Sequence, residues 1–243
     1  MALVLVTGAS TGLGLATATA LAEAGHDVVL HARNTARTGG DEAWDGMREI
    51  IHGDLAHADE TVRLAERANG IGRFDAVVHN AGVLDGPDVY AVNIVAPYLL
   101  TALMTPPKRT ILLGSSMHMG GSTDLSAVDF GRPGVRAYET SKLHVTALAM
   151  ALAARHPDTM VHTVDPGWVP TRMGGPGAPD DLDEGHRTQV WLATAPEGDI
   201  APRSGAYWHH RAPRRPHPAA HDARFQRELL AALASYTGVV LPA

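Results

Sequence analysis

Short apolar runs and helix-like segments alternate along the whole chain, and this alternation restricts the fold more than any other feature. The runs expected to form strands lie at 3–6, 28–30, 49–52, 76–79, 110–113, 160–164 and 205–208. Runs that are apolar on both faces are typical of strands buried between two layers of helices. Because strands joined through helices pair in parallel with right-handed crossovers, the sequence predicts a doubly wound α/β sheet of about seven strands.

Six helices are expected between these strands, at 13–24, 59–69, 88–104, 138–156, 187–195 and 224–236. Residues 34–47 are interpreted as a loop or a short, weak helix. Glycine, proline and aspartate interrupt residues 117–136 and 170–185, which are therefore interpreted as loops. We find no linker that would separate a second domain, so residues 1–243 are expected to form one domain.

The overall charge and the lack of cysteine exclude several kinds of function. The chain has a formal net charge of −6 and no cysteine. An acidic protein has no electrostatic reason to bind nucleic acid or an anionic membrane, and without thiols it can form neither disulfides nor thiolate metal sites. The first residues lack the pattern of a signal peptide, and no run is long enough to span a bilayer. We therefore expect a cytoplasmic protein with neither nucleic acid nor membrane as a partner.

A glycine-rich turn joins the first expected strand to the first expected helix, in the sequence Thr7-Gly8-Ala9-Ser10-Thr11-Gly12-Leu13-Gly14. Glycines allow a backbone to approach a pyrophosphate closely, and the free N–H groups and dipole of a helix start favour an anion. A tight connection without a ligand is the alternative interpretation. The position at the first strand–helix junction favours a nucleotide site.

This TGxxxGxG turn, together with the later motifs, resembles the short-chain dehydrogenase/reductase family over about residues 3–172. The resemblance implies a single-domain Rossmann fold with strand order 3-2-1-4-5-6-7 and a nicotinamide dinucleotide cofactor. Tyr138 follows Ser116 by 22 positions, and this long interval is similar to that of retinol-dehydrogenase-like and carbonyl-reductase-like members. The Ser-Ser-Met-His run resembles the retinol-dehydrogenase-like members.

The residues at the end of the second strand should meet the adenosine ribose. They therefore indicate whether NAD(H) or NADP(H) is the expected cofactor. Ala32 stands where family members that prefer NAD carry Asp, and Arg33 follows it. A guanidinium can pair with a 2′-phosphate through two hydrogen bonds, so NADP(H) is expected in preference to NAD(H). The alternative is that Arg33 is a solvated surface residue.

Further motifs complete the cofactor site that the resemblance implies. Asp54, followed by Leu55, would meet the adenine amino group, with a turn or helix-cap role as the alternative. The Asn80-Ala81-Gly82 motif would hold the central sheet and pass close to the cofactor. The segment 165–171 would contact the nicotinamide and direct pro-S hydride transfer. The expected cofactor-binding residues are Gly8, Ser10, Thr11, Gly12, Leu13, Gly14, Arg33, Asp54, Leu55, Asn80, Ala81, Gly82, Tyr138, Lys142, Pro166, Gly167, Val169 and Thr171.

Tyr138 and Lys142 form a YxxxK motif at the start of the long helix that follows the fifth strand. Residues four apart lie on one face of a helix, so the phenol and the ammonium should be neighbours. A free tyrosine has a pKa of about 10, and a nearby cation stabilises the phenolate. Tyr138 is therefore expected to act as general acid and base, assisted by Lys142.

Two more catalytic residues are expected from the resemblance. Ser116 would stabilise the substrate oxygen through its hydroxyl, with Ser115 as the alternative. The backbone carbonyl of Asn93 would hold a water linked to Lys142, which would complete a proton relay, although an ordinary polar helix residue is the alternative. The loops at about 117–136 and 172–200 would shape the substrate site. Trp168 and Met173 would either line it or pack in the core.

The sequence thus predicts an NADP(H)-dependent oxidoreductase that interconverts a ketone or aldehyde and an alcohol. A nonenzymatic NADP(H)-sensing regulator, or an epimerase or dehydratase on the same scaffold, are the alternatives. Sensors of this fold typically lack the tyrosine or the lysine.

The histidines at 209, 210, 217 and 221 fit no zinc spacing, so no metal is expected. The expected partner is a small-molecule carbonyl or alcohol. Assembly into a homo-oligomer stays open, because the loop before Tyr138 would obstruct the helices through which the family often associates.

Overall fold

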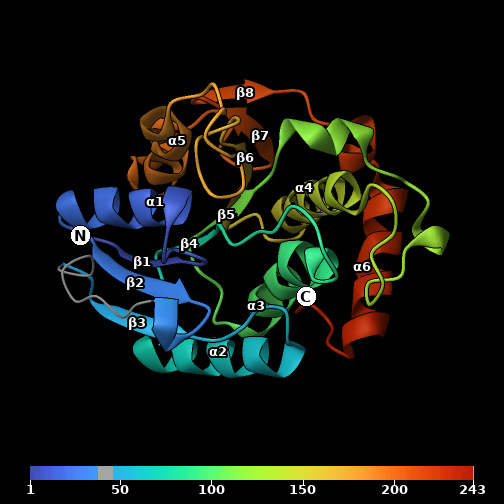
Figure 1. Cartoon of the computed structure of the whole chain (residues 1–243), viewed down its shortest axis with the longest axis horizontal. Coiled ribbons are helices and arrows are strands. Elements are labelled where there is room, and N and C mark those ends of the chain that lie inside the picture. The colour runs from blue at the N-terminus through green and yellow to red at the C-terminus, as the bar shows by residue number, and fades with distance from the viewer. Residues whose placement is uncertain (38–45, 243) are drawn as a thin grey trace.

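The computed structural model describes residues 1–37 and 46–242, and a single sheet organises them (Figure 1). The strands are β1 (Leu3–Val6), β2 (Asp27–Ala32), β3 (Glu49–His52), β4 (Ala76–His79), β5 (Arg109–Leu113), β6 (Met160–Asp165), β7 (Ala206–His209) and β8 (Ala212–Arg214). Their order is β3-β2-β1-β4-β5-β6-β7-β8, and only β8 runs antiparallel to its neighbour. The predicted Rossmann fold is confirmed, with one strand more than expected.

Helices cover both faces of the sheet (Figure 1). They are α1 (Gly12–Glu23), α2 (Ala58–Ile71), α3 (Ala96–Leu103), α4 (Ala137–Arg155), α5 (Leu182–Thr194) and α6 (Ala223–Thr237). Successive side chains of a strand point to opposite faces. Accordingly, Val4 and Val6 pack in the hydrophobic cluster that includes residues of α1 and α5, whereas Leu5 packs in the cluster that includes residues of α2 and α3. This burial on both sides explains the apolar runs in the sequence.

The long helix α4 is buried along most of its length. Fourteen of its nineteen residues are buried. Helix α6 supplies Phe225, Leu229 and Leu233 to the same hydrophobic cluster as Leu148 and Leu152 of α4. The C-terminal part of the chain therefore covers much of the helix that carries Tyr138.

Three elements differ from the expectation. The segment expected as one helix at 88–104 contains a π-helical turn at 91–95 ahead of α3. Helix α5 begins at Leu182 rather than 187, because the Asp181 side chain caps it by accepting a hydrogen bond from the Asp183 N–H. Strand β8 was not predicted, because it is three residues long and contains a proline. Of the expected loop or weak helix at 34–47, Thr35–Arg37 form a 3₁₀ turn and residues 38–45 lie outside the described residues. Among the described helices, none has the length and apolar character needed to cross a membrane.

Candidate active site

The glycine turn between β1 and α1 is braced by the end of β4. Gly8 has a φ of 63°, and a Cβ there would lie 2.8 Å from the Cα of Ala81. A Cβ on Gly14 would collide with the Asn80 amide nitrogen. Asn80 Nδ2 donates to the Thr7 carbonyl at 2.9 Å, and the Ala81 N–H donates to Thr7 Oγ1 at 3.1 Å. Glycine is therefore required at positions 8 and 14. The structure brings the glycine-rich turn and the Asn80-Ala81-Gly82 motif together.

The loop after β6 reaches across to the same turn. A Cβ on Gly12 would lie 3.2 Å from Thr171 Cγ2, so these two segments approach closely only because residue 12 is glycine. Pro166 and Gly167 begin this loop, and Val169 anchors it as a buried residue. Trp168 is 60% exposed, which excludes a core-packing role for its side chain. The remaining expected cofactor residues take several positions: Ser10 and Leu13 are partly buried in the turn, Thr11 is exposed, and Leu55 is buried in the core near α2.

Sequence reasoning missed His31, a buried residue of β2 that joins the loops after β1 and β3. The Gly8 N–H donates to His31 Nδ1 at 3.0 Å, so that nitrogen is the acceptor and carries no hydrogen. Nε2 therefore carries the hydrogen and donates to the Gly53 carbonyl at 2.8 Å. Burial lowers the pKa of His31 to about 4, which is consistent with this neutral form. A histidine within an otherwise apolar strand was the available signal.

Arg33 and Asp54 lie side by side just beyond the ends of β2 and β3. Arg33 Nε is 3.8 Å from Asp54 Oδ2, and the arginine side chain is 49% exposed. A pair this exposed holds the guanidinium only weakly. Asp54 Oδ1 accepts a hydrogen bond from the Ala56 N–H at 3.0 Å, so the turn role considered for this residue is present in the structure. Arg33 remains accessible to an anion in solution.

The structure brings Ser115, rather than Ser116, to Tyr138. Ser115 is partly buried and extended, with a φ of −170°, and its hydroxyl forms a side-chain hydrogen bond that lowers the pKa of Tyr138. Ser116 is exposed and begins the 3₁₀ turn η4 (Ser116–Gly120). The geometry therefore favours the alternative serine, because the register at the end of β5 decides which of two adjacent side chains points inward.

Lys142 lies one helical turn beyond Tyr138 and is almost completely buried. Its Nζ is 5.6 Å from the centre of the Tyr138 ring and donates to the Leu113 carbonyl at 2.8 Å. Burial lowers the pKa of Lys142 to about 8, while the Asp165 carboxylate opposes that change. Burial also raises the pKa of Tyr138, and the Ser115 hydroxyl only partly offsets it. In the chain alone the phenol is therefore held protonated.

Asn93 connects the loop after β4 to α4. It lies in a π-helical turn, η3 (Ala91–Val95), directly before α3. Its side chain exchanges two 2.9 Å hydrogen bonds with the backbone of Val83, and its Nδ2 also donates to Ser141 Oγ at 3.0 Å. A Cβ on Gly82 would lie 3.4 Å from Asn93 Oδ1 and 3.6 Å from Lys142 Nζ, so these residues meet at one place. π-Turns are frequent at functional sites. The role of the Asn93 carbonyl stays a prediction.

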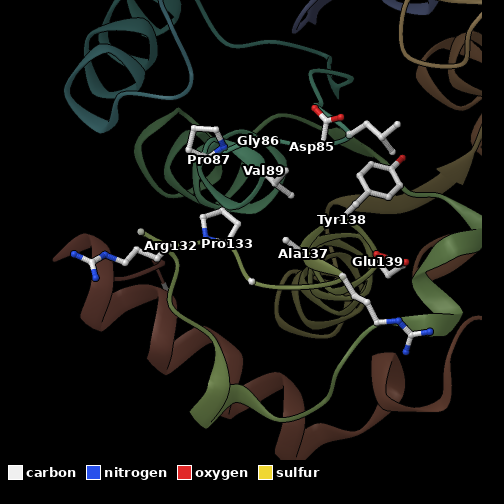
Figure 2. Close-up of a pocket in the computed structure, with 13 residues that line it drawn as sticks. Asp85, Gly86, Pro87, Val89, Arg132, Pro133, Ala137, Tyr138 and Glu139 are labelled. Atoms are coloured by element: carbon white, nitrogen blue, oxygen red, sulfur yellow. The ribbon is translucent and has the colours of Figure 1, made fainter.

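A cleft of about 570 Å³ opens beside Tyr138 (Figure 2). It lies between residues 84–89 and 131–139, so it includes the end of the expected substrate loop at 117–136 and a second segment that was not expected. Apolar side chains of Val89 and Ala137 lie near the tyrosine in Figure 2, and Arg132 lies at the opposite end. The cleft can admit a small molecule to the phenol.

The histidines near the C-terminus do not form a metal centre with other ligands. Within 1–37 and 46–242, no group of three or more His, Asp or Glu residues could hold a metal ion. His217 instead caps a short 3₁₀ turn, η7 (Pro218–His221), and His209 contacts the backbone carbonyl of Asp165.

Comparison with known proteins identifies the family. Residues 2–181 match the short chain dehydrogenase family. The chain is 38% identical to the short-chain dehydrogenase chry4 of Gibberella zeae, over 100% of this chain and 99% of that protein. A crystal structure of an uncharacterised protein from Mycobacterium paratuberculosis superposes with a TM-score of 0.83 at 23% identity, covering 100% of this chain and 96% of that one. A Shigella flexneri structure, described as a short chain dehydrogenase complexed with NADP, has a TM-score of 0.71 at 23% identity, covering 87% and 97%. The chain belongs to the short-chain dehydrogenase/reductase family of oxidoreductases.

Proposed function

We propose that this protein interconverts a ketone or aldehyde and an alcohol by hydride transfer with NADP(H), using Tyr138 as general acid and base. The observation that carries the proposal is the grouping of Ser115 and Lys142 around Tyr138, which itself lines an open cleft. A regulator that only senses the cofactor would have no use for a buried ammonium beside a phenol, because burying a charged group is costly.

The residues present fit a dinucleotide cofactor. Gly8, Gly12 and Gly14 keep the turn free of side chains at the start of α1, where an anion is favoured. Gly82 and Thr171 would border the nicotinamide half, and Arg33 and Asp54 the adenosine half. When bound, the nicotinamide supplies or accepts the hydride. A protein of this fold has been crystallised with NADP, which supports the assignment.

In the direction of carbonyl reduction, the chain's own groups supply the proton and stabilise the developing charge. The Ser115 hydroxyl would hydrogen-bond the carbonyl oxygen as negative charge develops on it. Tyr138, whose pKa is raised by burial, is protonated at neutral pH and would donate its phenolic proton to that oxygen. Lys142 would stabilise the resulting phenolate, which would regain its proton from solvent by way of Asn93 and Lys142.

The Arg33 side chain should set the preference between the two cofactors. We expect Arg33→Ala to lower the preference for NADPH over NADH about tenfold or more, because charge-assisted hydrogen bonds to a phosphate contribute roughly 1.5–3 kcal/mol. The measurement is the ratio of kcat/KM values for NADPH and NADH. Arg63→Ala, at an exposed position on α2, is the matched control. An unchanged ratio in Arg33→Ala would refute the NADP(H) assignment and leave the oxidoreductase assignment standing.

His31 should affect cofactor affinity without affecting the chemical step. We expect His31→Leu to raise the Kd for NADPH about tenfold, because it removes both hydrogen bonds that join the Gly8 and Gly53 loops. The kcat at saturating NADPH should stay within about threefold of the wild-type value, since His31 does not line the cleft beside Tyr138. Fluorescence titration of NADPH gives the Kd, and His57→Leu on the exposed start of α2 serves as the control. A change confined to kcat would contradict this role.

The proposed activity is tested by following absorbance at 340 nm with the purified protein, NADPH and a panel of ketones and aldehydes. We expect NADPH oxidation that depends on the carbonyl, with the matching alcohol as product. The reverse assay uses NADP⁺ and that alcohol. Tight NADPH binding without turnover of any carbonyl or alcohol would favour the sensing regulator instead.

A further inference from the structure

His118 is a buried histidine in η4, three residues after Ser115, and the reaction described above makes no use of it. The His217 N–H donates to His118 Nε2 at 2.9 Å. A backbone N–H can only donate, so Nε2 carries no hydrogen and Nδ1 must carry it in the neutral ring. The Nδ1–H therefore donates to the Ser115 carbonyl, 2.6 Å away. Burial, which lowers the pKa of His118, is consistent with a neutral ring.

Two hydrogen bonds from the same residue hold the Ser115 carbonyl. The second comes from the His118 backbone N–H at 3.0 Å. Fixing this carbonyl fixes the peptide plane that follows Ser115. The direction of the Ser115 hydroxyl towards Tyr138 depends on the backbone that carries it.

The other side of the His118 ring is supported by β7 and β6. The Tyr207 ring lies against it, with the ring centres 4.6 Å apart. Tyr207 Oη donates to Asp165 Oδ2 at 3.0 Å, and Asp165 Oδ1 accepts from the Gly167 N–H at 3.1 Å. Burial and the adjacent Asp165 carboxylate strongly raise the pKa of Tyr207, so it stays a hydrogen-bond donor. The same set of contacts therefore links Ser115 to the loop that begins at Pro166.

We propose that His118 is a positioning residue for carbonyl reduction: its Nδ1–H holds the Ser115 carbonyl, and thereby the Ser115 hydroxyl, in place for Tyr138, while Tyr207 and Asp165 hold the histidine ring. This inference rests on the proposed function. The two ring nitrogens then have separate tasks. Nδ1 positions Ser115 for catalysis, and Nε2 holds the C-terminal segment by accepting a hydrogen bond from the His217 N–H.

Two amide substitutions separate these tasks. The amide nitrogen of His118→Asn lies near the position of Nδ1 and can still donate to Ser115. The amide of His118→Gln reaches the position of Nε2 and can meet His217 but not Ser115. We expect His118→Gln to lower kcat for the carbonyl about 10- to 100-fold, because small displacements of a catalytic group can cost about 10²-fold in rate. We expect His118→Asn to retain kcat within about threefold.

The Kd for NADPH and the melting temperature are measured beside kcat in each variant. The exposed His221→Gln serves as the control, and the same quantities are measured for it. The expected pattern is an unchanged Kd in both variants, a lower kcat only in His118→Gln, and a lower melting temperature in His118→Asn. Equal kcat values in the two variants, or losses of kcat that follow the melting temperature, would overturn the inference. Absence of turnover in the wild-type protein with every carbonyl would instead overturn the proposed function, and the inference with it.

Discussion

Replacing Tyr138 with phenylalanine should lower kcat for carbonyl reduction about 10³-fold, because general acid catalysis contributes roughly 10²- to 10⁴-fold and this substitution removes only the phenolic oxygen. Burial raises the pKa of Tyr138, so the proton to be donated is present across the neutral range. A 10³-fold loss corresponds to about 4 kcal/mol of transition-state stabilisation. The phenyl ring would keep its place beside the cleft, so the cofactor site should be unaffected.

The measurement is kcat at saturating NADPH and carbonyl, with the Kd for NADPH determined in parallel. Tyr236→Phe is a matched control, because Tyr236 is 51% exposed on the C-terminal helix α6. The Kd for NADPH should stay within about threefold of wild type in both variants, since neither changes the turn at the start of α1. If Tyr138→Phe turned over within tenfold of the wild-type rate, another group would have to supply the proton.

The second large effect separates two adjacent serines. Ser115→Ala should lower kcat about 10²-fold, because removal of one hydrogen-bond donor to a developing oxyanion typically costs 10²- to 10³-fold. Ser116→Ala should leave kcat within about twofold, since Ser116 is exposed at the start of η4. The two substitutions are chemically identical and one position apart, so each serves as the control for the other.

Steady-state kcat and KM for one carbonyl suffice for this comparison. A large loss in Ser116→Ala with near-normal turnover in Ser115→Ala would restore the assignment made from the family resemblance. Losses of similar size in both variants would indicate disturbance of η4 as a whole, and the melting temperatures would reveal it.

Most of the fold could be predicted because its signals are local. The apolar runs of β1, β2, β4 and β6 are buried on both faces, and that burial is what makes them recognisable. The glycine turn and the pair formed by Tyr138 and Lys142 are each contained in a few consecutive residues. Local spacing therefore sufficed to place these groups at the carboxyl ends of the strands.

The missed features depend on contacts between distant residues. The hydrogen bond between His118 and His217 spans 99 positions, and that between His31 and Gly53 spans 22. The choice between Ser115 and Ser116 depends on where β5 ends, and no residue type signals that point. Sequence spacing also predicted proximity of Lys142 to Tyr138 but not their burial, which controls the pKa of both groups.

Transfer of deuterium from stereospecifically labelled NADPH to the product tests the central claim most directly. The protein is incubated with a carbonyl that it turns over and with NADPH deuterated at C4 in the pro-S position, and the alcohol is analysed by mass spectrometry and NMR. We predict one deuterium at the carbinol carbon, and none when the pro-R label is used. An alcohol without deuterium from either cofactor would contradict direct hydride transfer and, with it, the function proposed for Tyr138.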